Sequence, residues 1–125
     1  MAPSSLTVSE IDAATAARAL AGCEGLDPCG MVESVEELAS RGRCFAIDGE
    51  ARAVYVISTN NGCAWVEAVK GEGPADLTRI LDAVIEAQAE GLRSVGCQTA
   101  RPGLVRKLKR HGWTVAGWIM RKDLQ

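Results

Sequence analysis

The sequence predicts one α/β domain, residues 1–125, built on a mixed sheet. Three strand-like runs follow one another with hairpin-type turns between them, which indicates an antiparallel β-meander. A long amphipathic helix then separates two further strand patterns, and a strand–helix–strand unit joins parallel neighbours. The chain has 125 residues, 47% hydrophobic and 24% charged, which is typical of a globular domain that buries a core.

Two short helices are expected before the meander. Residues 6–8 can form a short strand, and Ser9 is a suitable N-cap for a helix over 10–20. A glycine- and proline-containing loop follows that helix. The second helix is predicted over 32–39 and ends before Arg41 and Gly42.

The meander is predicted from three runs that are rich in β-forming residues. These runs cover 44–47, 51–58 and 63–69. Asp48-Gly49 separates the first pair, and Asn60-Asn61-Gly62 separates the second pair. Both are strong hairpin signals, because glycine and asparagine tolerate positive φ.

The second half of the chain predicts the crossover and a C-terminal strand. A glycine-rich turn over 70–74 leads into the clearest helix, over 75–90. A strand over 92–99 follows, then a basic helix over 104–110 and a last strand over 113–120. The expected fold is therefore a meander, a β-α-β crossover, a further helix and a C-terminal strand.

The cysteines do not form a disulfide or metal pattern. Their number is odd, they are widely spread, and no Cys-x-x-Cys pair occurs. His111 is the only histidine, so we expect reduced thiols and no metal site. The five cysteines are Cys23, Cys29, Cys44, Cys63 and Cys97.

Charge and hydropathy indicate the compartment in which the protein occurs and the classes of partner that it can bind. No apolar run approaches the ~18 residues of a membrane span, and the N-terminus lacks a signal-peptide pattern, so we expect a cytoplasmic protein without a membrane partner. Residues 1–50 carry nine acids against three bases, and residues 101–122 carry seven bases and no acid. A basic end suits phosphates, of a nucleotide or of nucleic acid, although charge runs are more often solvated helix faces.

The order of elements, with a glycine turn before the main helix, resembles the GNAT acetyltransferases. Family members carry Arg or Gln, then x-x-Gly-x-Gly/Ala, at that helix, and Lys70-x-x-Gly73-x-Ala75 is similar. His111-Gly112-Trp113 is similar to the family's Gly-aromatic signature after a helix. The resemblance implies an acetyl-CoA-dependent N-acetyltransferase in which a primary amine of a small molecule or a protein attacks directly.

The resemblance also implies a binding site for acetyl-CoA. The pantetheine arm would pair with backbone as an extra strand does, and the pyrophosphate would lie on the glycine turn at the positive helix end. The general base would be Glu67, with His111 and Cys97 as weaker candidates for a catalytic role. The implied cofactor-binding residues are Val66, Ala68 and Val69 for the arm, Lys70, Gly71, Gly73 and Ala75 for the pyrophosphate, and Arg106 or Lys107 for the other phosphate.

Several residues depart from the family pattern. Glu72 and Asp76 would repel a pyrophosphate, and Pro74 lacks one N–H donor. Leu108 stands where the family often has a tyrosine that protonates the CoA thiolate. These departures favour a second hypothesis, a catalytically inactive GNAT-fold binding or assembly module of a bacterial or phage setting.

A third, weaker hypothesis is nucleic-acid binding through the basic helix at 104–110. A homodimer is one of the assemblies that we consider.

Overall fold

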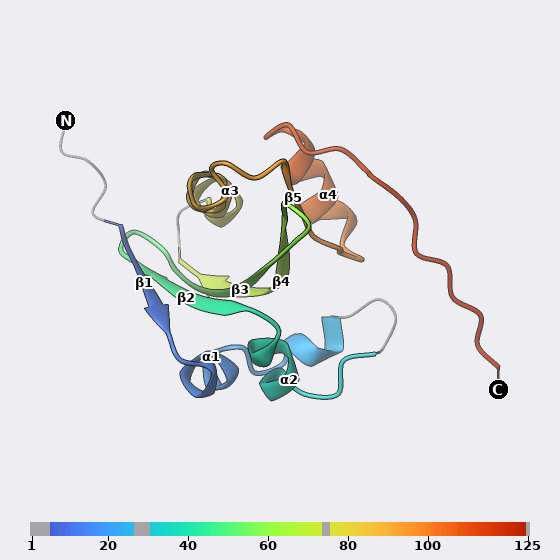
Figure 1. Ribbon diagram of the computed structural model, residues 1–125, viewed down its shortest axis with the longest axis horizontal. Coiled ribbons are helices and arrows are strands. Elements are labelled where there is room, and N and C mark those ends of the chain that lie inside the picture. Colours follow the sequence, from blue (N-terminus) through green and yellow to red (C-terminus); the bar gives the residue numbers. More distant parts are fainter. Residues whose placement is uncertain (1–5, 27–30, 74–75, 125) are drawn as a thin grey trace.

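The computed structural model describes residues 6–26, 31–73 and 76–124. A five-stranded sheet in the order β1-β2-β3-β4-β5 forms the middle layer. Helices α1 and α2 cover one face of this sheet, and α3 and α4 lie over the other (Figure 1). Neighbouring strands are antiparallel except for the β4–β5 pair, so the predicted mixed α/β fold is confirmed.

The first strand extends further than the sequence predicted. Strand β1 (Thr7–Ile11) pairs with β2 up to Ile11, opposite Cys44. Helix α1 (Ala13–Ala19) therefore starts later, and Asp12 rather than Ser9 is its N-cap, with Oδ1 accepting from the Thr15 amide at 2.7 Å. The prediction of a Ser9 cap was wrong because strand pairing keeps the backbone at residues 9–11 extended.

The second helix is also shorter than predicted. A 3₁₀ turn, η1 (Cys23–Leu26), follows α1, and α2 runs over Val35–Ser40. Ser34 caps α2, because its hydroxyl accepts from the Glu37 amide at 3.1 Å. That cap fixes the helix start three residues after the predicted Val32.

The meander is confirmed, and its last strand is longer than predicted. It consists of β2 (Arg43–Asp48), β3 (Arg52–Asn60) and β4 (Cys63–Glu72). The β3–β4 turn has positive φ at both central residues, 53° at Asn61 and 76° at Gly62, as the hairpin signal predicted. Lys70 and Gly71 pair with Val54 and Ala53 of β3, so they belong to β4 and not to a turn.

The crossover is confirmed, with a much shorter final strand. Helix α3 (Leu77–Gln88) connects β4 to β5 (Ser94–Gly96), which pairs parallel to the start of β4. Helix α4 (Pro102–Lys109) follows, close to its predicted position. None of the helices in the described residues is long and apolar enough to cross a bilayer.

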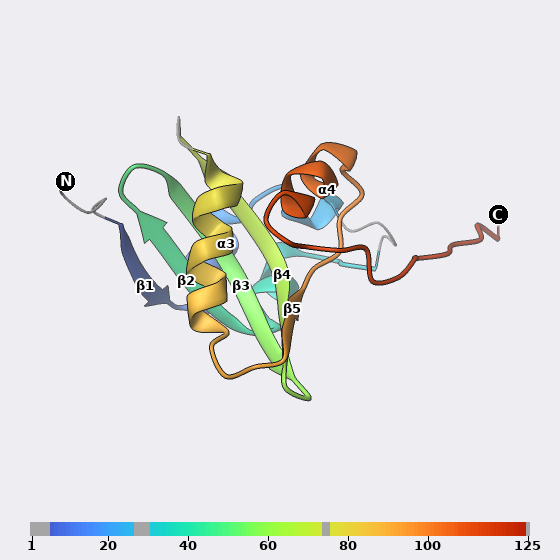
Figure 2. The ribbon, with the colours of Figure 1, turned by 90° about the horizontal axis from the view of Figure 1, so that it is seen from above.

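The predicted C-terminal strand at 113–120 is not formed. The indole Nε1 of Trp113 donates to Asp82 Oδ1 at 2.7 Å, and the Trp113 amide donates to the Leu108 carbonyl at 3.2 Å. These contacts hold the start of the segment beside α3 and α4, and the chain then runs away from the body of the domain (Figure 2). Its backbone does not reach the edge of the sheet, so no pairing forms.

Each face of the sheet carries its own apolar core. On one face, Leu20 and Leu38 from the N-terminal helices pack with Cys44 and Val56 of the sheet. On the other face, Ile80 and Ile85 of α3 belong to a cluster that surrounds the fully buried Tyr55. The two cores pack against opposite faces of β3 and β4, which carry the candidate site.

Candidate functional site

The site begins where β4 and β5 separate. The two strands pair only at Cys63–Ser94, Ala64–Val95 and Trp65–Gly96. Beyond Trp65, β4 continues to Glu72 and pairs with β3 alone. Figure 2 shows β5 ending where β4 runs on. The backbone edge of β4 on the β5 side is therefore left without a strand partner within the described sheet.

A β-bulge lies at the same position. Val56 is opposite Ala68 and Ile57 is opposite Val66, so Glu67 is the extra residue of β4. A bulge disturbs the alternation of side chains and bends the strand, which is common beside functional sites. Simple alternation along β4 therefore does not assign the faces of Val66 and Glu67.

A cavity of about 390 Å³ lies at this separation. Its walls come from β4, from the segment after β5, from α3 and α4, and from the η1–α2 region on the other face of the sheet. Most of the contributing side chains are apolar. Those that matter below are Arg41, Glu67, Asp82, Cys97, Ala100, Arg101, Leu104 and Leu108.

Glu67 is the most enclosed carboxylate of the site. Its side chain is 14% exposed. Oε2 accepts a hydrogen bond from the Ser58 hydroxyl at 2.7 Å, and Oε1 lies 3.7 Å from Nη1 of Arg41. Both contacts hold the carboxylate in one orientation at the wall of the cavity.

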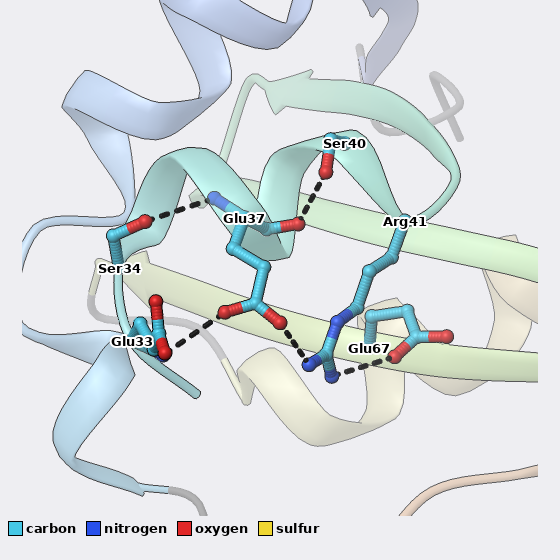
Figure 3. A network of polar contacts seen from close by, with 6 residues as sticks. All are labelled: Glu33, Ser34, Glu37, Ser40, Arg41 and Glu67. Atoms are coloured by element: carbon cyan, nitrogen blue, oxygen red, sulfur yellow. Dashed lines mark hydrogen bonds and ion pairs between the residues drawn. The ribbon is translucent and has the colours of Figure 1, made fainter. Parts of the chain in front are cut away.

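Arg41 links Glu67 to α2. Its Nη2 donates to Glu37 Oε1 at 2.8 Å, and the other Glu37 oxygen accepts from the Glu33 amide at 3.0 Å (Figure 3). Two carboxylates thus contact one guanidinium beside this end of the cavity. The Glu67 carboxylate at the wall favours a cationic group over an anionic one there.

The cavity brings together five of the residues that the sequence proposed. Val66, Glu67, Ala68, Val69 and the weaker candidate Cys97 all line it. Lys70, Gly71, Gly73 and Arg106 do not line it, and Ala75 lies outside the described residues. The predicted arm residues and the predicted base therefore share one site, from which the predicted pyrophosphate residues are separate.

Lys70 and Gly71 have structural roles. The Lys70 ammonium donates to the Ala21 carbonyl at 2.6 Å, which ties β4 to the segment after α1. A Cβ added at Gly71 would lie 2.5 Å from Leu77 Cδ2 and 2.7 Å from the Arg52 carbonyl oxygen. Glycine is therefore required at position 71 by close packing within the domain.

The first turn of α3 is capped by the chain itself. A carboxylate oxygen of Asp76 accepts from the Arg79 amide at 3.3 Å. A carboxylate at this position satisfies a free N–H and the helix dipole. The Asp76 carboxylate therefore occupies the helix end at which the sequence analysis placed the pyrophosphate, which it would repel.

A second polar group borders the cavity from α3. Asp82 accepts from the Trp113 indole, and its other oxygen lies 4.0 Å from Nδ1 of His111. His111 thus lies beside α3 and does not line the cavity. Burial raises the pKa of the nearby Cys97 thiol, which keeps it protonated and makes it a poor nucleophile.

Sequence reasoning missed four residues of the site: Arg41, Ser58, Asp82 and Arg101. Arg41 and Ser58 reach Glu67 only through the fold of α2 and β3, and no local pattern marks them. Arg101 was visible as one base in a basic segment, but only the folded chain places it at the cavity. Within the described residues, no cluster of His, Cys, Asp or Glu could hold a metal ion.

A comparison with models of known protein families finds no match for this chain, and a comparison with curated protein sequences finds none either.

Proposed function

We propose that this chain binds acetyl-CoA at the β4–β5 separation and transfers the acetyl group to a primary amine. One observation carries the proposal: an edge of β4 that has no strand partner in the described sheet borders a cavity whose wall also holds an enclosed carboxylate, Glu67. This combination supplies a place for an extended thioester substrate and a group that can accept a proton.

The unpaired edge suits the pantetheine arm. That arm contains two amide groups and is extended, so it can add to β4 as a peptide strand adds to an open sheet edge. Leu104 and Leu108 of α4 and Val69 of β4 give the cavity apolar walls for its methylene groups. Arg101, rather than Arg106, is the cation at this cavity that suits a phosphate.

The transfer needs few protein groups. The amine nitrogen attacks the acetyl carbonyl carbon, the carbon–sulfur bond breaks, and the thiolate leaves and takes a proton from water. An ammonium acceptor first gives one proton to the Glu67 carboxylate, directly or through a water, so that its nitrogen has a lone pair with which to attack. The second proton, lost from the nitrogen as the amide forms, passes to water and balances the one that the thiolate takes. Positioning two substrates in one cavity supplies much of the rate, so the absence of a tyrosine at Leu108 does not exclude the reaction.

The acceptor that fits best is a cation. The Glu67 carboxylate lines the cavity wall, and an incoming ammonium group would be attracted to it. We therefore expect the acceptor amine to enter from the α2 side of the cavity.

A second candidate function is a binding module that does not catalyse transfer. Two observations favour it: Lys70 is held by the Ala21 carbonyl, and Asp76 caps α3. Both remove groups that would otherwise bind the pyrophosphate. The two candidates differ in whether acetyl-CoA binds and gives up its acetyl group.

Acetyl-CoA should raise the thermal midpoint of this chain. At 100 times its dissociation constant, a ligand adds about 2.7 kcal/mol to the free energy of unfolding. Ala100→Trp should abolish the shift, because Ala100 lines the cavity and a large ring there would block it.

Ala87→Trp is the matched control, since Ala87 is exposed on α3 and does not line the cavity, and its shift should persist. No shift in the unaltered chain at millimolar acetyl-CoA would exclude the transferase and leave the binding module.

A further inference from the structure

The last eleven described residues, 114–124, form an exposed apolar segment that we name the C-terminal arm. All of them are exposed, and the arm leaves the body of the domain in both views (Figures 1 and 2). Trp118 is 87% exposed and Met120 is 89% exposed. Its large apolar side chains are Val115, Trp118, Ile119, Met120 and Leu124, five of the eight exposed large hydrophobic residues that the structure describes.

The arm can reach another molecule. Its start is held by the Trp113 contacts to Asp82 and Leu108. Eleven extended residues span roughly 36 Å at about 3.3 Å each. An apolar segment of this length in water is the kind of surface that marks a protein interaction.

The same chain has an open strand edge. The sheet ends at β5, and within the described residues no strand lies on its far side. Trp65, 39% exposed, stands over Gly96 at this end of the sheet, where an added Cβ would lie 2.9 Å from the indole ring. An unpaired edge beside an exposed aromatic ring is a template for strand addition.

We propose that the C-terminal arm of one chain adds as a strand to β5 of a second copy, and that the second copy returns the same contact. Residues 114–120 combine β-branched and aromatic residues with small ones, which suits a strand. Each chain holds an open edge and a strand-forming arm that does not reach that edge. A two-fold pair satisfies both at once and closes.

Charge also favours a second copy as the partner. Helix α4 and residues 114–122 of the arm belong to the region 101–122 with seven bases and no acid, Asp123 follows it, and residues 1–50 carry nine acids against three bases. Two copies related by a two-fold axis can bring the basic end of each near the acidic end of the other. This inference does not depend on acetyl-CoA binding.

Sedimentation velocity of the full chain at increasing protein concentration tests whether two copies pair through their arms. The unaltered chain should convert from monomer to dimer, and Met120→Asp should remain monomeric. Met31→Asp is the matched control, because Met31 is 75% exposed and lies outside the arm, and it should still dimerise. Met120 is 89% exposed and belongs to neither apolar core of the described residues, so Met120→Asp should fold normally, as circular dichroism would show.

Hydrogen exchange locates the contact. Amides 94–100 should exchange more slowly as the dimer forms, and should not slow in Met120→Asp. Four outcomes would each overturn the proposal. Three are a monomer at every concentration, a dimer that Met120→Asp leaves intact, and open-ended oligomers. The fourth is slow hydrogen exchange of amides 94–100 in a monomer, which would mean that the arm folds back onto its own β5.

Discussion

Glu67→Gln should lower kcat for acetyl transfer by about 10²- to 10⁴-fold, the usual contribution of a positioned general base. The amide keeps the shape of the carboxylate and a hydrogen bond to Ser58, but it cannot take the proton from the attacking amine. Acetyl-CoA binding, followed by the thermal midpoint, should change little. The measurement is the release of free thiol from acetyl-CoA with a cationic amine as acceptor.

The matched control is Glu86→Gln, because Glu86 is exposed on α3 and does not line the cavity. It should retain the full rate. An unchanged kcat in Glu67→Gln would remove Glu67 as the base, even if acetyl-CoA binds. If the unaltered chain binds acetyl-CoA but transfers nothing to any amine, the site is a binding site only.

Tyr55→Ala should destabilise the domain by about 3–5 kcal/mol, the range for large aromatic side chains removed from a core. Tyr55 is fully buried and stacks on Phe45, with ring centroids 5.5 Å apart. Its hydroxyl donates to Gln88 Oε1 at the end of α3. A cavity at this position would loosen the packing of α3 on the sheet. Urea unfolding measures the loss.

Tyr55→Phe separates the ring from the hydroxyl, and it should cost only about 0.5–1.5 kcal/mol. Burial raises the pKa of Tyr55 to about 12, whereas the unfolded chain ionises near pH 10. The unfolded state therefore loses its proton first, and stability falls as the pH rises from about 10 to 12.

Tyr55→Phe has no hydroxyl to ionise at this position, so its free energy of unfolding should fall less than that of the unaltered chain over the same pH range. Equal alkaline destabilisation of both proteins would contradict the burial of the hydroxyl.

The parts of the fold that the sequence predicted are those with a local cause. The Asn61-Gly62 turn needs positive φ, and asparagine followed by glycine predicts such a turn. The apolar stripe of α3 and the strand runs on each side of it predicted the crossover. The wrong predictions lie where a contact with a residue far away in the sequence determines the local structure. Pairing with β2 kept residues 9–11 extended, and the contact of Trp113 with Asp82 directed the C-terminal segment away from the sheet.

The candidate site was predicted in part for the same reason. Val66, Glu67, Ala68 and Val69 are consecutive, so placing one strand placed all four. Arg41 and Ser58 come from separate elements and meet Glu67 only in the folded chain. Lys70, Gly71, Gly73 and Ala75 were chosen from a glycine pattern, and Arg106 from the basic helix. In the structure Gly71 is needed for packing against β3 and α3.

The most direct test of the central claim is amide hydrogen exchange of β4 with saturating acetyl-CoA. The claim is that an extended thioester substrate lies along the free edge of β4. Amides 66–69 should exchange more slowly with acetyl-CoA, and β1 should not change, because the β1–β2 pair lies at the opposite edge of the sheet. Unchanged exchange at 66–69 under conditions in which acetyl-CoA binds would contradict the account, since the substrate would then lie elsewhere.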